Sequence, residues 1–104
     1  MPKIFKYKLN NHGVTEVTIK GSHQVLSAGF QGGDLVVWVL MLDPNQELPE
    51  HKVTFHSIFT GEEIQKASPG RVMQFIETLQ SQGFVFHIFV ECSLAYAELP
   101  KVIR

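Results

Sequence analysis

The residues best suited to chemistry in this sequence are its histidines, and two of them stand within apolar segments. His56 and His87 each interrupt a run of hydrophobic residues. If the two runs pair as strands, the rings would converge, where they could hold a transition metal or act as a general acid and base. The structural alternative is a ring whose nitrogens find backbone, Thr or Ser partners, and this is the interpretation we favour. The other histidines, His12, His23 and His51, lie at predicted turns and are expected to face solvent.

The spacing of the histidines and cysteines gives no support to a metal site. No HxH, HxxxH or HExxH pattern occurs, and two histidine ligands are too few for a structural zinc site. The only cysteine, Cys92, rules out an intrachain disulfide and a thiolate zinc site, and it fits a reducing compartment. Its neighbour Glu91 disfavours a thiolate, so we expect an inert thiol. We therefore expect neither a metal nor a cofactor.

Two turn segments could instead bring backbone N–H groups close to an anion. Ser68-Pro69-Gly70-Arg71 would place N–H groups and a guanidinium around a phosphate, and Thr60-Gly61 allows a second close approach of the backbone. Neither segment matches a P-loop or a dinucleotide fingerprint, and a plain turn is the competing interpretation for both. The predicted ligand-binding residues are therefore Arg71, Thr60, His56 and His87.

Length and charge exclude several classes of protein. The chain has 104 residues, which indicates one domain, and 44% of them are hydrophobic. A net charge of -1 supplies no positive field for a phosphate backbone, so nucleic-acid binding is disfavoured. No apolar run approaches the ~18 residues of a membrane span, and no signal peptide is evident. We therefore expect a cytoplasmic protein without membrane association.

Short apolar segments separated by turn residues predict a mostly β fold. We expect strands over 4–9, 15–20, 25–31, 35–42, 52–60 and 84–90, with the first two forming a hairpin through Asn10–Gly13. The pattern predicts a small antiparallel sandwich or barrel-like sheet of about seven strands. Segments 35–42 and 84–90 are apolar on both faces, which requires two covering layers. The chain itself can supply one layer and a partner subunit the other, so we predict a homo-oligomer.

The segment 69–82 supports two interpretations. Val72, Phe75, Ile76 and Leu79 have helical spacing after a Ser68 N-cap, which predicts a helix over 69–82. The alternative is a strand around 74–80 that turns at 81–83 into the last strand. Residues 1–91 would form the single β domain. Residues 92–104 would form a C-terminal tail, either a short helix that Pro100 stops or an arm that packs on a neighbour.

A set of short motifs in a fixed order gives the chain a family resemblance. They are Ile4-Phe5-Lys6-Tyr7-Lys8-Leu9, Gln31-Gly32-Gly33 leading to Val37-Trp38 and Asp43-Pro44, Thr60-Gly61 with Ile64, and Thr78-Leu79-Gln80 before Val85-Phe86-His87-Ile88-Phe89. Over residues 4–90 the chain resembles a family of small proteins of unknown function encoded by tailed bacteriophages and prophages. The loop 45–51, the stretch 62–71 and the tail after Glu91 depart from the family pattern. The resemblance implies a mostly β phage accessory protein, favours the strand at 74–80 and brings no catalytic residues.

These observations lead to one favoured function and two alternatives. The resemblance and the lack of a catalytic constellation favour a non-enzymatic accessory protein that binds a host component. It would counter antiviral defence by sequestering a small nucleotide-type signal. The first alternative is a stoichiometric inhibitor that covers a host protein surface through the tail or the loop 45–51. The second alternative is a small hydrolase that uses His56 and His87.

Overall fold

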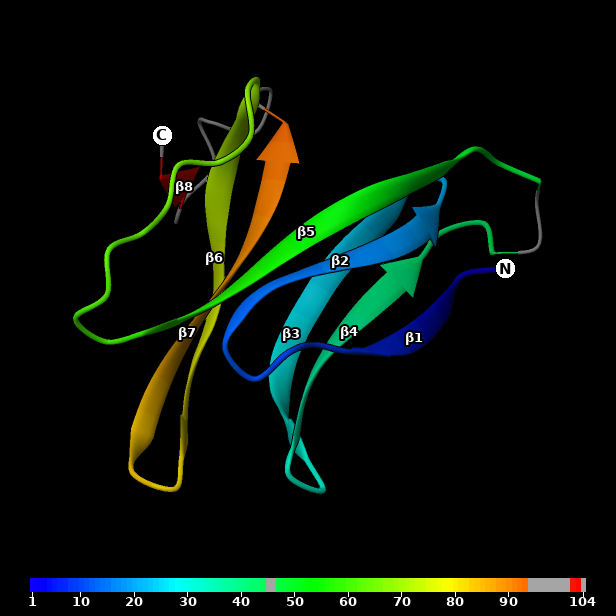
Figure 1. Cartoon of the computed structure of the whole chain (residues 1–104). Coiled ribbons are helices and arrows are strands. Elements are labelled where there is room, and N and C mark those ends of the chain that lie inside the picture. Colours follow the sequence, from blue (N-terminus) through cyan, green and yellow to red (C-terminus); the bar gives the residue numbers. More distant parts are fainter. Residues whose placement is uncertain (45–46, 94–101, 104) are drawn as a thin grey trace.

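The elements of the structure are all strands. The computed structural model describes residues 1–44, 47–93 and 102–103 (Figure 1). The strands are β1 (Lys3–Lys8), β2 (Gly13–Lys20), β3 (His23–Gln31), β4 (Asp34–Met41), β5 (Glu50–Phe59), β6 (Arg71–Ser81), β7 (Phe84–Ser93) and β8 (Val102–Ile103). The described residues contain no helix that could cross a membrane.

The strands form two antiparallel sheets that share one core. The first sheet has the order β1-β4-β3 and the second has the order β2-β5-β7-β6-β8. Leu35, Val37 and Val39 of β4 face Phe55 of β5 and Ile88 of β7 in one hydrophobic cluster. Strand alternation puts alternate residues of β2, β4, β5 and β7 into this cluster, and the two sheets bury these faces against each other. The prediction of a small, mostly β sandwich of about seven strands is confirmed.

The predicted hairpin between segments 4–9 and 15–20 is wrong. β1 pairs with β4 in the first sheet, whereas β2 pairs with β5 in the second sheet. The connection bonds to both sheets, because Leu9 N–H donates to Leu35 O (2.9 Å) and Ser57 Oγ donates to Asn11 O (2.7 Å). Two strands that face one core from opposite sheets show the same alternation as a hairpin. The apolar pattern alone therefore could not separate the two arrangements.

Of the two interpretations of segment 69–82, the helix is wrong and the strand, which the family resemblance favours, is confirmed. β6 pairs with β7 from Arg71–Ser93 to Ser81–Phe84. A bulge between Phe75 and Glu77 shifts the alternation, and residues on both faces of the strand are buried. The bulge and the burial on both faces together give the apolar residues of this strand a spacing that is typical of a helix. Positive φ angles at Gln82 (51°) and Gly83 (83°) form the tight turn that leads into β7.

The outer face of β7 is covered by the chain itself. Phe89 packs with Ile58 and Met73 in a second hydrophobic cluster, and Ala67 packs against this cluster from the segment between β5 and β6. We call residues 60–70 the covering segment (Figure 1).

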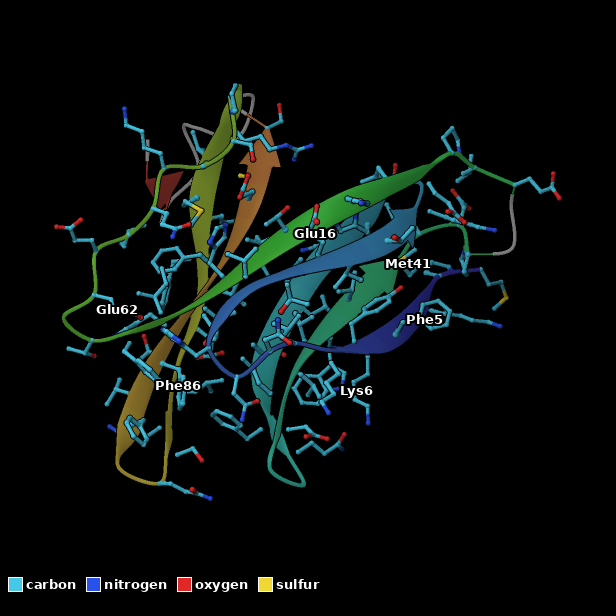
Figure 2. All side chains as sticks on the ribbon, in the orientation of Figure 1. Phe5, Lys6, Glu16, Met41, Glu62 and Phe86 are labelled. Atoms are coloured by element: carbon cyan, nitrogen blue, oxygen red, sulfur yellow. The ribbon has the colours of Figure 1, made fainter. Side chains whose placement is uncertain are left out.

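The outer face of β4 differs, because Val36 is buried there while Trp38 and Leu40 are only half-buried. Figure 2 shows Phe5 and Lys6 leaving the neighbouring β1 on opposite sides.

The C-terminal part of the chain adds one short strand to the second sheet. Residues 92 and 93 continue β7, and β8 pairs with β6 through Met73–Ile103 and Gln74–Val102. The helix or arm predicted within 92–104 falls mainly on residues 94–101, which lie outside the described residues. The same holds for residues 45 and 46 of the loop 45–51.

Candidate functional site

A cavity with mixed polar and apolar walls opens at one end of the sandwich, between the two sheets. Its volume is about 460 Å³. Antiparallel pairing brings the first residue of β6 beside the last residue of β7, and the beginnings of β3 and β5 approach them from the two sheets. The described residues that line the cavity are His23, Gln24, Val25, Leu42, His51, Val53, Arg71, Gln74, Val90, Glu91, Cys92 and Ser93.

Two histidines from different sheets meet at this cavity. The ring centroids of His23 and His51 are 5.3 Å apart, with an angle of 34° between the ring planes. Burial lowers the pKa of His23, and the nearby His51 lowers it further, while a hydrogen bond with the backbone of Gly21 opposes both effects. The cavity therefore disfavours a positive charge on His23.

Arg71 and Cys92 supply the other groups of chemical interest. Burial raises the pKa of the Cys92 thiol, and the charge of Arg71 offsets only part of this effect. The thiol therefore stays protonated near neutral pH, as expected of an inert cysteine. Arg71 makes no ion pair among the described residues, so its guanidinium is available to a ligand.

Glu91 lies in the cavity wall, but its charge is already matched by the protein. Its Oε2 is 2.7 Å from His56 Nε2, and its Oε1 accepts a hydrogen bond from Ser68 N–H at 3.0 Å. The side chains of His56 and Glu91 are only 7% and 4% exposed. Burial alone would raise the pKa of Glu91, but the hydrogen bonds from His56 and Ser68 outweigh it and lower the pKa. The carboxylate therefore stays ionised within a buried network.

The turn predicted to hold an anion holds this carboxylate. Arg71 N–H donates to Ser68 O at 3.0 Å, and Gly70 between them has a φ of 78°. Because Ser68 N–H is bonded to Glu91, the backbone of the turn serves the protein's own anion. The turn therefore offers only the side chain of Arg71, which lines the cavity, to a ligand.

Thr60 and His87 form a separate cluster. Thr60 Oγ1 is 2.7 Å from His87 Nε2, and Thr78 Oγ1 is 3.0 Å from His87 Nδ1. Both ring nitrogens thus have the threonine partners that the structural interpretation of this histidine predicts. His87 precedes Glu91 by four residues on β7, which corresponds to roughly 13 Å along a strand. The four predicted ligand-binding residues therefore do not form one site. Arg71 lines the cavity and His56 adjoins it through Glu91, whereas Thr60 and His87 lie elsewhere.

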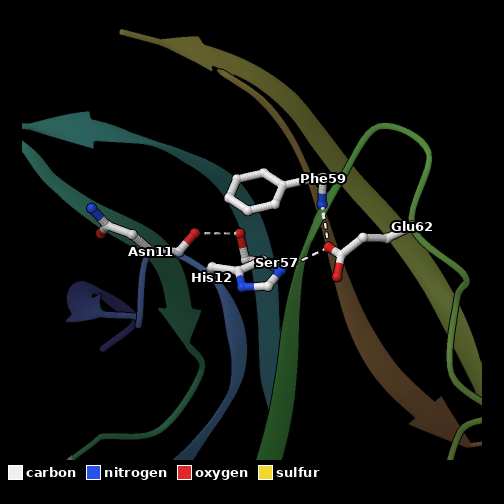
Figure 3. Close-up of polar contacts among 5 residues, drawn as sticks. All are labelled: Asn11, His12, Ser57, Phe59 and Glu62. Atoms are coloured by element: carbon white, nitrogen blue, oxygen red, sulfur yellow. Dashed lines mark hydrogen bonds and ion pairs between the residues drawn. The ribbon is translucent and has the colours of Figure 1, made fainter. Parts of the chain in front are cut away.

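His12 takes part in a further polar contact, at the start of the covering segment (Figure 3). Its ring stacks on Phe59 with centroids 4.2 Å apart and 7° between the planes. His12 Nε2 is 2.7 Å from Glu62 Oε1, which also accepts a hydrogen bond from Phe59 N–H at 2.7 Å. The bond from Phe59 and then that from His12 lower the pKa of Glu62. Figure 2 places Glu62 on the covering segment, so this contact ties that segment to the turn after β1.

The sequence predictions missed His23, His51 and Glu91. Because each of the two histidines follows turn residues, the sequence predicts that both face solvent. In the structure they meet at one cavity, where His23 is half-buried and His51 is exposed at the rim. Nothing in the local sequence signals this encounter. Glu91 did carry a signal, because a carboxylate that continues an apolar strand needs a buried partner. Among the described residues, no three His, Cys, Asp or Glu side chains come together as metal ligands would.

Comparison with known proteins assigns a family but no activity. The sequence model described as "Domain of unknown function (DUF7352)" matches residues 1–97. The chain therefore belongs to this family. No curated protein and no solved structure matches the chain.

Proposed function

We propose that this member of a family of unknown function is a non-enzymatic protein that binds a small anion of the nucleotide type. One observation carries the proposal: Arg71, His23, His51 and Gln74 line the same cavity between the sheets. The volume of about 460 Å³ falls within the range of roughly 300–1,000 Å³ that is usual for small-molecule sites.

The charges of the cavity favour an anion. Glu91 is the only carboxylate among the described lining residues, and His56 and Ser68 already bind it. The guanidinium of Arg71 remains, together with two imidazoles that can gain protons. A phosphate group would match these donors, and Gln74 could bond the polar edge of a base or sugar.

The biological setting of the proposal comes from the sequence resemblance to proteins of tailed phages. We propose a phage accessory protein that works in the host cytoplasm and sequesters a nucleotide signal of antiviral defence. A net charge of -1 argues against the alternative that the anion is a long nucleic acid.

Binding is tested by thermal unfolding in the presence of AMP, cyclic AMP and ADP-ribose. A ligand at 100 times its Kd adds about 2.7 kcal/mol to the free energy of unfolding. We expect a shift for at least one of these compounds, and we expect Arg71→Gln to abolish it. Lys8→Gln is the matched control, because it also removes one exposed positive charge but lies outside the cavity lining. Absence of any shift with the wild-type protein would reject the proposal.

The two alternatives give different results in the same experiments. An inhibitor of a host protein would show no shift with small molecules and would retain one host protein in affinity capture. A hydrolase would turn over its substrate and lose turnover in His87→Ala. The hydrolase requires a rearrangement, because Glu91 engages His56 while Thr60 and Thr78 engage His87.

We also propose that the protein is a homo-oligomer whose second copy packs on the outer face of the first sheet. Trp38 and Leu40 are half-buried there, and Ile4 and Leu26 are 60% and 44% exposed. Light scattering after size exclusion should report an oligomer for the wild-type protein and a monomer for the double variant Ile4→Ser, Leu26→Ser. Val14→Ser, which changes a residue of β2 that is 44% exposed, should leave the oligomer intact. A wild-type monomer at micromolar concentration would contradict this proposal.

A further inference from the structure

We infer that the cavity takes a phosphate monoester as its dianion, and that binding is coupled to the uptake of one proton by the His23–His51 pair. The inference rests on the proposed function, and it names the charge state of the ligand and the groups that recognise it. It is carried by the short separation of the two rings and by the fact that they line the same cavity as Arg71.

The two rings are close enough to affect each other's protonation. Their centroids are 5.3 Å apart, and they enter the cavity from β3 of the first sheet and β5 of the second. Two positive charges at this separation repel each other, so the pair cannot readily become doubly charged. Without a ligand, burial and His51 also hold the pKa of His23 below its ordinary value. Burial and the neighbouring ring thus disfavour a proton on His23 when no anion is bound.

The other charged and titratable groups of the cavity do not supply an anion for this pair. β6 contributes Arg71, which is cationic, and β7 contributes Glu91 and Cys92. Glu91 is bonded to His56 and Ser68, and burial keeps the Cys92 thiol neutral. A proton on the His23–His51 pair would therefore lack a counter-charge until a ligand brings one.

A phosphate dianion supplies the missing charge. Arg71 can balance one negative charge, and a protonated imidazole balances the second and donates a hydrogen bond to the phosphate from a ring N–H. The second ionisation of a phosphate monoester has a pKa of about 6, so the dianion predominates above neutrality. A cyclic phosphodiester carries one negative charge, which Arg71 alone can match. The site should therefore prefer the monoester and take up a proton only with it.

Isothermal titration calorimetry with AMP and cyclic AMP tests this coupling. Between pH 6.5 and 8.0 AMP is mainly the dianion, its remaining monoanion is corrected for from its known pKa, and buffers of different ionisation enthalpy reveal the protons taken up. For AMP we expect net proton uptake in the middle of this range and a Kd that rises roughly fivefold to tenfold from pH 6.5 to 8.0. For cyclic AMP we expect weaker binding without proton uptake.

Variants assign the proton to the pair. His23→Gln and His51→Gln should each reduce the proton uptake and flatten the pH dependence while AMP still binds through Arg71. His12→Gln is the control, because this histidine does not line the cavity and should leave the coupling unchanged. The inference is wrong, and the proposed function stands, if AMP binds without proton uptake, if both pair variants keep the coupling, or if only cyclic AMP or ADP-ribose binds. If none of the three compounds binds at any pH, the inference and the proposed function both fail.

Discussion

His56 and His23 are histidines in opposite surroundings, and the contrast separates a structural network from the proposed binding site. His56 lies on the outer face of the second sheet, where the Glu91 carboxylate meets its ring at 2.7 Å and Ser68 N–H completes the network. His23 lies at the open end of the sandwich, where its ring contacts that of another histidine, His51. The first network is closed, whereas no carboxylate of the described residues forms an ion pair with His23 or His51.

The largest effect should follow from opening the closed network. In Glu91→Ala, the ring of His56 and the N–H of Ser68 lose their partner in a buried site. We expect the free energy of unfolding to fall by about 3 kcal/mol, because removing one member of a buried pair leaves the other uncompensated. Urea denaturation measures this loss. Glu16→Gln, at an exposed position of β2, should change stability by less than about 0.5 kcal/mol. A loss in Glu91→Ala no larger than that of the control would contradict a structural role for the network.

A smaller effect should follow from neutralising Glu91 with acid. Its pKa is lower in the folded protein than in the unfolded chain, because the hydrogen bonds from His56 and Ser68 outweigh burial. The stabilisation is therefore present above the unfolded pKa of about 4.5 and is lost as the pH falls through the folded pKa. Denaturant midpoints between pH 3 and pH 6 should fall more steeply for the wild-type protein than for Glu91→Gln. Parallel curves would show that other carboxylates carry the acid sensitivity.

The open pair should have a weaker pH effect at a higher pH. The pKa of His23 is lowered by burial and by His51, so the folded protein holds fewer protons than the unfolded chain below about pH 6.5. Stability should decline slightly as the pH falls below that value, and His23→Gln should remove this decline. The effect should be smaller than that of Glu91, because His23 is only half-buried. Saturating AMP should reverse its sign, and a decline unchanged by AMP would argue against contact between the ligand and this ring.

The smallest effect is expected at His12, the exposed counterpart of His56. Its bond to Glu62 and its stacking on Phe59 lie near the surface, where water replaces much of what is lost. We expect His12→Ala to lower the free energy of unfolding far less than Glu91→Ala does, through the loss of the contact with Glu62 and of the stacking on Phe59. Thermal unfolding compared with Glu91→Ala measures the difference. A loss as large as that of Glu91→Ala would mean that burial does not govern how much these histidine–carboxylate pairs contribute to the free energy of unfolding.

Residues of the site differ in how far they could be predicted. Arg71 was predicted because a guanidinium that follows a Ser-Pro-Gly turn is a local pattern, and it does line the cavity. Thr60 and His87 were grouped with it because both had suitable chemistry, but β7 separates His87 from the cavity by about four residues of strand. His23 and His51 are 28 positions apart in different sheets, so no local pattern could join them.

The sequence predicted most of the strands, since alternation and turn residues are local and each segment carries its own pattern. It left open which strands pair. Segments 4–9 and 15–20 have apolar faces that fit a hairpin as well as two facing sheets, and the bulge in β6 produces helical spacing in a strand. Only the tertiary structure decided these points and assembled the cavity, because the register of strands far apart in the chain is set by the burial of a common core.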